Sequence, residues 1–274
     1  MERAEAGRGA SMSESMPTEV RRERMLALLT EQEFARVAEL AEAFGVSSVT
    51  VRADLDALEE QGKVRRVRGG AVSAGPAPHV EASFELSLGT AAVEKSSIAK
   101  VAARLVGSGE SVLMGAGTTT TYVARELVAR PDLTEVTVFT NGLRTALELE
   151  PALPRISVVV TGGSLRRQQH SLVDPLGGKL LEGIRAHTVI LGCGGVDAAG
   201  GVTNVSLPDA EMKQRMLRAA TRKILVADAS KLGVVEMAPI CAVGEIDLLI
   251  TGESADPECV AALRDKGLAV EIAR

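Results

Sequence analysis

Residues 46–72 read VSSVTVRADLDALEEQGKVRRVRGGAV, and this stretch decides the fold of the N-terminal part of the chain. Three apolar side chains are spaced i, i+4 and i+7 and so share one face of a helix: Val51, Leu55 and Leu58. Ser47 precedes the pattern as a candidate N-cap, and Gly62 follows it as a candidate C-cap. The stretch therefore predicts a helix over 48–61 that is buried on one side and free for a partner on the other.

The free side of this helix is slim at its N-terminal end and is followed by a basic hairpin. It carries Ser48, Val49, Thr50, Arg52 and Ala53. Beyond the helix, cations and valines alternate over 63–68 with the period of a strand, and Gly69 and Gly70 supply a turn. The hairpin contains Lys63, Arg65, Arg66 and Arg68 and no acid. A slim helix end beside a group of cations suits the major groove of DNA, so these side chains are the candidate DNA contacts.

Two further helical patterns precede this stretch. Apolar positions repeat with a helical period from residue 18, and Phe34 and Ala35 lead into a second such pattern that ends at Phe44. A turn at 45–47 then joins the second helix to the third, which is the helix-turn-helix arrangement, and the hairpin makes it winged. The alternative is a three-helix bundle with a solvated charged face. The slim helix end and the adjacent cations favour DNA binding.

Composition limits which nucleic acid can be bound. Aromatic residues make up only 2% of the 274 residues, so binding by base stacking has little to work with, and duplex DNA is the expected partner. The net charge is −5, and residues 18–72 contain nine Lys or Arg against ten Asp or Glu. Phosphate contacts must therefore come from the local basic group. One such group is small, which favours binding as a dimer or tetramer.

Several classes of protein are disfavoured. The three cysteines show no CxxC spacing, so we expect free thiols, no disulfide and no metal site: Cys193, Cys241 and Cys259. No apolar run is long enough to cross a membrane, and the N-terminus lacks the apolar core of a signal peptide. We therefore expect a cytoplasmic protein without membrane contact. Residues 1–17 are small and polar and are predicted to be a disordered extension.

The rest of the chain has the pattern of an α/β domain. Residues 18–73 form the predicted winged domain, 74–93 a linker rich in proline and small residues, and 94–274 a second domain. Apolar runs that predict buried strands are 111–114, 136–140, 156–160, 188–192, 224–228, 248–251 and 268–272. Helical patterns cover 94–106, 120–129, 143–149, 175–181, 209–220 and 257–266. Their alternation predicts a doubly wound, largely parallel sheet.

Ligands of such sheets bind at the carboxyl ends of the strands, and the loops there carry glycines, hydroxyls and cations. The loop after the first predicted strand, residues 115–121, opens into a helix, and the free amides and dipole of that helix suit an anion. It lacks the Gly-Lys-Ser/Thr ending of a nucleotide-binding P-loop. The candidate ligand contacts are Lys95, Gly117, Thr118, Thr119, Thr120, Asn141, Gly162, Gly163, Gly194 and Lys231. This set suits a small phosphorylated polyol.

The whole of the N-terminal domain resembles the DNA-binding domain of the DeoR family of bacterial transcription regulators, including VSSVTVRADLDALEEQG and RGGA. Motifs over 94–233 resemble the family's effector domain: EKSSIA, GAGTTTTYVA, FTNG, VVTGGSL, GCGGVDAAGGVTN, AEMKQRM and DASKLG. The resemblance implies a fold similar to ribose-5-phosphate isomerase and glucosamine-6-phosphate deaminase. It also implies a repressor of carbohydrate genes that binds a sugar phosphate. Three positions depart from the family pattern, where Arg, Asp and Gly are usual: Ala53, Gly115 and Asp174.

Two other functions stay open. One is a sugar-phosphate isomerase that uses a carboxylate such as Asp197, Asp209 or Glu211 as its acid or base. The chain lacks the full catalytic loop of those enzymes, so we expect no catalytic residue and no cofactor. The other is a DNA-binding scaffold without a ligand. Activation in place of repression is also compatible with the sequence, because the sign of regulation depends on where the operator lies.

Overall fold

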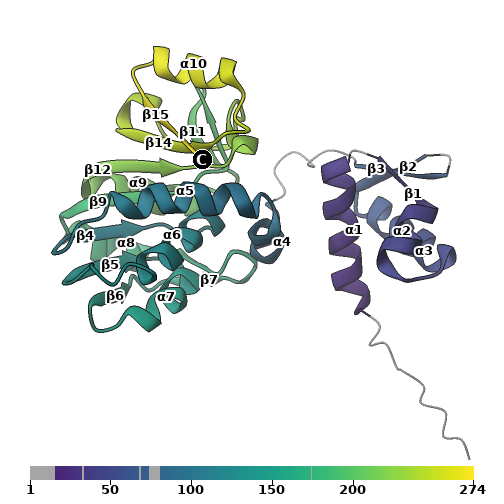
Figure 1. The fold of residues 1–274 in the computed structure, drawn as a ribbon, viewed down its shortest axis with the longest axis horizontal. Coiled ribbons are helices and arrows are strands. Elements are labelled where there is room, and N and C mark those ends of the chain that lie inside the picture. Colours follow the sequence, from purple (N-terminus) through teal and green to yellow (C-terminus); the bar gives the residue numbers. More distant parts are fainter. Residues whose placement is uncertain (1–15, 33, 68, 74–80, 174) are drawn as a thin grey trace, which may run out of the picture. The chain divides into compact units, whose positions relative to one another are not determined.

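The computed structural model describes residues 16–32, 34–67, 69–73, 81–173 and 175–274. The chain divides into two compact units, Met1–Pro78 and His79–Arg274, and each is described here by itself (Figure 1). No helix within the described ranges is long and apolar enough to cross a membrane.

The described residues of the first unit form three helices, α1 (Thr18–Gln32), α2 (Val37–Phe44) and α3 (Ser48–Glu60). The predicted start of α3 is confirmed, because the Ser47 hydroxyl accepts a hydrogen bond from the Thr50 amide at 3.1 Å. The helix ends one residue earlier than predicted. Gly62 follows with a φ of +69°, a left-handed conformation that glycine adopts without strain. The core of this unit is formed by Met25, Leu29, Leu40, Val51, Leu55, Leu58 and Val64.

A three-stranded antiparallel sheet completes this unit. The predicted hairpin is confirmed as β2 (Val64–Val67) and β3 (Gly70–Ser73), and β1 (Phe34–Arg36) pairs with the other side of β3. The predicted second helix is confirmed as α2, which begins directly after Phe34–Arg36 and ends at Phe44. The sequence did not predict that the residues leading into it form a strand, which pairing of Ala35 with Ala71 holds in the sheet.

The second unit is built on a seven-stranded sheet in the order β15-β14-β12-β9-β4-β5-β6, and every neighbouring pair in it is parallel. Its strands are β4 (Ser111–Met114), β5 (Val136–Thr140), β6 (Ile156–Val160), β9 (Ala186–Leu191), β12 (Ala220–Val226), β14 (Leu248–Gly252) and β15 (Ala269–Ala273). The parallel α/β prediction is confirmed. The first three strands have the predicted bounds, and the others differ by up to four residues.

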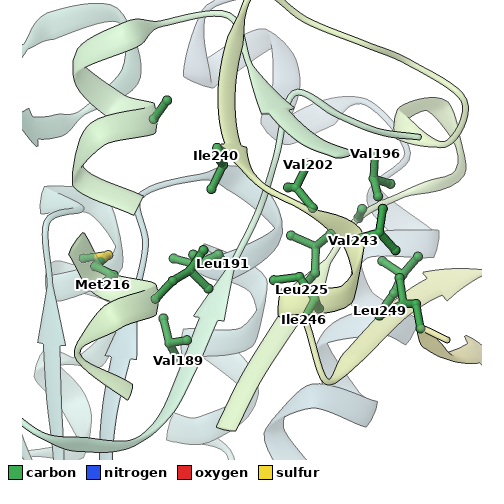
Figure 2. Close-up of a cluster of buried hydrophobic side chains, with 14 of the residues drawn as sticks. Val189, Leu191, Val196, Val202, Met216, Leu225, Ile240, Val243, Ile246 and Leu249 are labelled. Carbon is green, nitrogen blue, oxygen red and sulfur yellow. The ribbon is translucent and has the colours of Figure 1, made fainter. Parts of the chain in front are cut away.

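Helices cover both faces of the sheet. One face packs on α5 (Ala92–Arg104), α6 (Thr118–Val128) and α7 (Leu143–Leu149), and the other on α8 (Pro175–Glu182), α9 (Leu207–Arg218) and α10 (Pro257–Asp265). Neighbouring strand residues alternate between the two cores, so that Ile190 enters one and Leu191 the other. Figure 2 shows the second core, where Leu191, Leu225 and Leu249 project from adjacent strands.

Shorter elements cap the second core and border the sheet. They are α4 (Phe84–Gly89), β7 (Ser164–Arg166), β8 (Ser171–Val173), β10 (Gly195–Asp197), β11 (Gly201–Asn204) and β13 (Ala238–Cys241). The strands β10, β11 and β13 form a small antiparallel sheet, and β7 pairs with β8. None of these was predicted. The helix α4 lies inside the segment 74–93 that the sequence predicts to be a linker.

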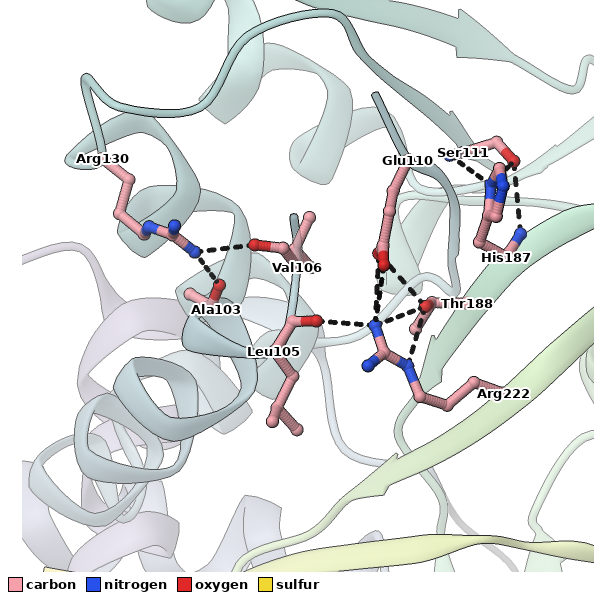
Figure 3. Close-up of polar contacts among 9 residues, drawn as sticks. All are labelled: Ala103, Leu105, Val106, Glu110, Ser111, Arg130, His187, Thr188 and Arg222. Atoms are coloured by element: carbon pink, nitrogen blue, oxygen red, sulfur yellow. Dashed lines mark hydrogen bonds and ion pairs between the residues drawn. The ribbon is translucent and has the colours of Figure 1, made fainter. Parts of the chain in front are cut away.

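Polar contacts fasten the amino ends of the central strands (Figure 3). The Arg222 guanidinium donates to the Thr188 hydroxyl at 2.8 Å and to the Leu105 carbonyl at 2.6 Å, and it pairs with Glu110 at 3.2 Å. His187 accepts a hydrogen bond from the Ser111 amide at 3.0 Å. These contacts occupy the polar groups at this edge with each other. The opposite edge, at the carboxyl ends, is where ligand-binding groups are expected.

Candidate nucleic-acid interface and anion site

The predicted DNA-contact residues of α3 lie on one exposed face of that helix. Val49 is 72% exposed, and Ser48, Arg52 and Ala53 are exposed with it, whereas Val51 on the opposite face is fully buried. Thr50 is half-buried, and its hydroxyl lies 2.9 Å from that of Ser47. The structure thus presents the face that the spacing indicated. Contact with DNA stays a prediction.

The hairpin cations are not equivalent. Arg65 is exposed and Lys63 half-buried, and neither side chain has a hydrogen bond or ion pair within the described parts of the chain. Arg66 instead pairs through Nη1 with Asp56 of α3 and donates to the Arg52 carbonyl at 3.2 Å. It therefore clamps the hairpin to α3. The predicted contact Arg68 lies outside the described residues.

A buried ion-pair triad fixes α3 against α1. The Asp54 carboxylate accepts from Arg21 at 2.7 Å and from Arg22 at 2.8 Å, and Asp54 is 1% exposed. Burial alone would raise the pKa of the Asp54 carboxyl, but hydrogen bonds from the two arginines outweigh it and lower that pKa. Sequence reasoning missed this triad because its partners are more than thirty positions apart. The only local signal was an acid on the apolar side of the helix.

In the second unit, the start of α6 offers unused donors. The Thr120 hydroxyl donates to the Gly115 carbonyl at 2.7 Å, and that of Thr121 donates to the Gly117 carbonyl at 2.7 Å, so both hold the loop closed. The hydroxyls of Thr118 and Thr119 have no partner within the described residues. The first amides of a helix also lack partners inside the helix. Together these donors make the start of α6 a candidate anion site, here called the anion cradle.

Asn141 organises the neighbouring loops. Its side-chain oxygen accepts from the Ala116 amide at 2.8 Å, and its nitrogen donates to the Leu172 carbonyl at 3.0 Å. The residue is 1% exposed. The sequence predicted that Asn141 offers these groups to a ligand, whereas the structure uses one donor and one acceptor to join the first two loops to β8.

The two predicted lysines differ in the same way. Lys95 is 3% exposed, and its ammonium donates to the carbonyls of Ser87 and Thr90, both at 2.7 Å, with Asp228 at 3.6 Å. Burial lowers the pKa of the Lys95 ammonium, and Asp228 opposes that change. Lys231 is half-buried and has no partner among the described side chains. Lys231 is therefore the available cation at this edge.

The predicted glycines act partly through close packing. A Cβ on Gly163 would lie 2.5 Å from the Val173 carbonyl oxygen, and one on Gly194 would lie 3.2 Å from the Asn204 Cα. A side chain at either position would separate these segments. Gly162 has open space around it and a φ of +77°.

A second buried polar cluster lies beside Gly194 and was missed as a unit. The Asp209 carboxylate accepts from Lys213 at 2.8 Å and from Asn204 at 2.6 Å through one oxygen, and its other oxygen is buried without a partner among the described residues. Burial raises the pKa of the nearby Cys193 thiol to about 11, so it is neutral at pH 7. The described part of the chain contains no cluster of three His, Cys, Asp or Glu placed to hold a metal.

Two surface hollows lie elsewhere on this unit. One, of about 580 Å³, is lined by Thr134, Leu153, Arg155 and their neighbours, and the other, of about 320 Å³, by Leu207, Glu211, Pro239 and theirs. Neither contains a predicted ligand residue. The candidate anion site is therefore defined by its free donors.

Comparison with known proteins supports both halves of this description. Residues 21–76 match the profile of the DeoR-like helix-turn-helix domain, and residues 90–253 match that of the DeoR C terminal sensor domain. The uncharacterized HTH-type transcriptional regulator YulB of Bacillus subtilis is 36% identical over 91% of this chain and 95% of its own. GolR of Listeria innocua is 33% identical over 92% and 98%, and the putative aga operon transcriptional repressor of Escherichia coli O157:H7 is 33% identical over 92% and 93%.

Solved structures give a fainter likeness. Ribose 5-phosphate isomerase A of Methanocaldococcus jannaschii covers 50% of this chain and 52% of its own, with a TM-score of 0.38 and 18% identity. A likeness this low carries no argument about function.

A winged helix-turn-helix unit followed by a parallel α/β sensor unit defines a DNA-binding transcriptional regulator. Both profiles match in the expected order, and relatives above 30% identity are aligned over nearly the whole chain. The chain belongs to the DeoR family.

Proposed function

We propose that this regulator represses genes of carbohydrate metabolism and that a phosphorylated sugar lowers its affinity for the operator. The observation that carries the proposal is the anion cradle: free amides at the start of α6, the unpaired hydroxyls of Thr118 and Thr119, and the unpaired ammonium of Lys231. The Escherichia coli O157:H7 relative is named as a putative aga operon transcriptional repressor, which supports the sign of regulation.

The phosphate is expected at the cradle and the hydroxyls of the sugar toward Asp209. The unpartnered oxygen of Asp209 can accept a hydrogen bond, and a buried acceptor without a donor is unfavourable until something supplies one. Asp209 is already held by Lys213 and Asn204, and exposed Glu211 pairs with Arg215 at 2.8 Å. We therefore assign these carboxylates to binding and structure, and propose no enzymatic role.

Control by the sugar phosphate requires unequal affinity for two states. A ligand that bound the DNA-competent and DNA-incompetent arrangements equally would shift neither population. We propose that the ester binds the incompetent arrangement more tightly. We also propose that the protein acts in the cytoplasm. It acts there as a homodimer or tetramer, because a single DNA-binding unit offers few unpaired cations to the DNA backbone.

Operator capture tests the proposal. The full-length protein is mixed with sheared DNA from its own genome, and the bound fragments are sequenced. We expect a paired half-site upstream of genes for sugar uptake or metabolism. The Arg52→Ala variant should lose this enrichment, while Arg264→Ala, which changes an exposed arginine on α10, should keep it. Enrichment without sequence preference, or equal enrichment by both variants, would contradict the proposal.

A further inference from the structure

Residues 81–90, here called the α4 segment, are the first described residues of the second unit. Along the chain they follow residues 74–80, which lie outside the described residues and lead back to the DNA-binding unit. The start of the segment is held by β7, β8 and the loop between them. Glu81 pairs with Arg166, and Gln169 donates to the Ala82 carbonyl at 2.7 Å. The His170 ring stacks on Phe84 with centroids 5.1 Å apart. These contacts place the beginning of the segment against this hairpin.

The end of the segment is held by two other elements. The Tyr122 hydroxyl of α6 donates to the Leu88 carbonyl at 3.3 Å. The Lys95 ammonium of α5 donates to the carbonyls of Ser87 and Thr90. The α4 segment is thus tied at both ends by side chains that come from other elements.

Each tie is next to a loop of the candidate anion site. Tyr122 follows Thr118 by one helical turn and so lies on the same side of α6. The hairpin that holds the segment follows Gly163 directly, and the His170 carbonyl accepts from the Leu143 amide, two residues after Asn141, at 2.9 Å. Lys95 lies 3.6 Å from Asp228 in the loop after β12. Each loop is thus connected to the α4 segment by a residue or hairpin beside it, so a change in the loop is passed on to the segment.

A phosphate and the α4 segment would compete for the ammonium of Lys95. An ammonium has three donors and no acceptor. Two of these donors are used by Ser87 and Thr90, and the remaining one faces Asp228 at the longer distance of 3.6 Å. For Lys95 to bind a phosphate, it must therefore release a carbonyl of the α4 segment or its contact with Asp228.

We propose that the α4 segment is a strap that links the anion site to the DNA-binding unit: when the site is empty, Lys95, Tyr122 and Gln169 hold it in place, and a bound phosphate ester competes for Lys95 and releases it. The inference rests on the proposed function. It adds a route for the control. Occupancy of the anion site changes the α4 segment, and this segment is connected along the chain to the DNA-binding unit.

The test loosens the strap without touching the anion site. Gln169→Ala removes the hydrogen bond to Ala82, and Tyr122→Phe removes the one to Leu88. Gln214→Ala is the matched control, because its side chain makes the same kind of bond, to the Pro239 carbonyl at 2.9 Å, away from the strap. Each full-length variant is measured without ligand, by hydrogen exchange of the amides of 84–90 and by affinity for the operator captured with wild-type protein.

We expect exchange in 84–90 to quicken about fivefold in each strap variant, as for loss of one hydrogen bond. Operator affinity should fall in the same variants, and further in the double variant, while Gln214→Ala matches wild type in both measurements. Unchanged exchange, or faster exchange with unchanged operator affinity, would overturn the strap. Failure of the proposed function looks different: wild type itself would then select no operator, or no sugar phosphate would alter its binding.

Discussion

At the scale of single residues, the orientation of the recognition helix depends on one buried carboxylate. Asp54 lies on the inner side of α3 and pairs with Arg21 and Arg22 of α1. The exposed residues of α3 can face a groove only while this inner side is held. The buried ion pairs of Asp54 therefore hold in place the helix face that is predicted to contact DNA.

Replacement of this carboxylate should destabilise the first unit. Asp54→Asn leaves Arg21 without its buried partner, which costs about 3–5 kcal/mol. Asp56→Asn is the control, because that exposed ion pair contributes about 0–1 kcal/mol. Hydrogen exchange of the α3 amides in urea, at pH 7 in the full-length protein, measures both. Equal protection of α3 in Asp54→Asn and wild type would contradict the expectation.

The same carboxylate gives a pH dependence. Its pKa is lower in the folded protein than the ordinary value of 3.8, so its stabilising effect is complete above that value and is lost as the pH falls through the folded pKa. The difference in α3 protection between wild type and Asp54→Asn should therefore be constant from pH 6 to 8 and shrink below about pH 4. A difference that grew on acidification would have the wrong sign.

Ala53 tests which face of α3 meets DNA. It is exposed beside Val49 and Arg52 and stands where the family usually has an arginine. Ala53→Arg should tighten operator binding or shift the preferred base, by about 1–3 kcal/mol if the new side chain contacts a guanine through two hydrogen bonds. Anisotropy titrations against a set of single-base operator variants measure both effects. No change in affinity or preference would show that another face is used.

At the scale of elements, the sequence predicts strands and helices well where the apolar pattern is long and the burial is on both faces. The run 136–140 has the predicted bounds because Val136 and Val138 enter one core and Phe139 packs against the other. β1 was not predicted, since three residues carry no period of their own and their partner Ala71 is distant in the chain. β10, β11 and β13 escaped for the same reason.

The loops of the candidate site could be predicted from the sequence, but which of their side chains remain free for a ligand could not. The rule that ligands bind at the carboxyl ends of parallel strands selects the loops that form the candidate site, and ligand binding there stays a prediction. It could not tell that Asn141 and Lys95 are occupied by backbone groups, because their partners Leu172, Ser87 and Thr90 lie in short elements without a sequence signal. The Lys231 ammonium and the Thr118 hydroxyl have no partner among the described residues.

The small sheet of the first unit should fail through a single methyl group. A Cβ on Gly70 would lie 2.3 Å from the Ala35 carbonyl oxygen, which is backbone and cannot rotate away. Gly70→Ala should therefore separate β1 from β3, cost about 1–3 kcal/mol and weaken operator binding. Gly244→Ala, with open space around it, is the control. Circular dichroism melting and operator anisotropy are the measurements, and wild-type values for Gly70→Ala would refute the packing argument.

At the scale of the whole molecule, an acidic protein binds a polyanion through a local group of cations. The guanidinium groups of Arg52 and Arg65 and the ammonium of Lys63 have no partner within the described residues of one DNA-binding unit, whereas Arg66 is engaged by Asp56. Each neutralised phosphate lowers the slope of log K against log salt by about 0.9. Operator binding should therefore show a slope of about −3 for one head and about −6 for two. A slope near −3 would contradict the proposed dimer.

The central claim is that occupancy of the anion site and operator reading are coupled in one chain. The most direct measurement is the affinity of the full-length protein for its captured operator as a phosphorylated sugar is added, with the same sugar lacking phosphate as control. We predict that an ester which raises the melting temperature also weakens operator binding, by about 5- to 150-fold, and that Lys231→Met reduces both effects. An ester that binds the protein while operator affinity stays constant would contradict the account.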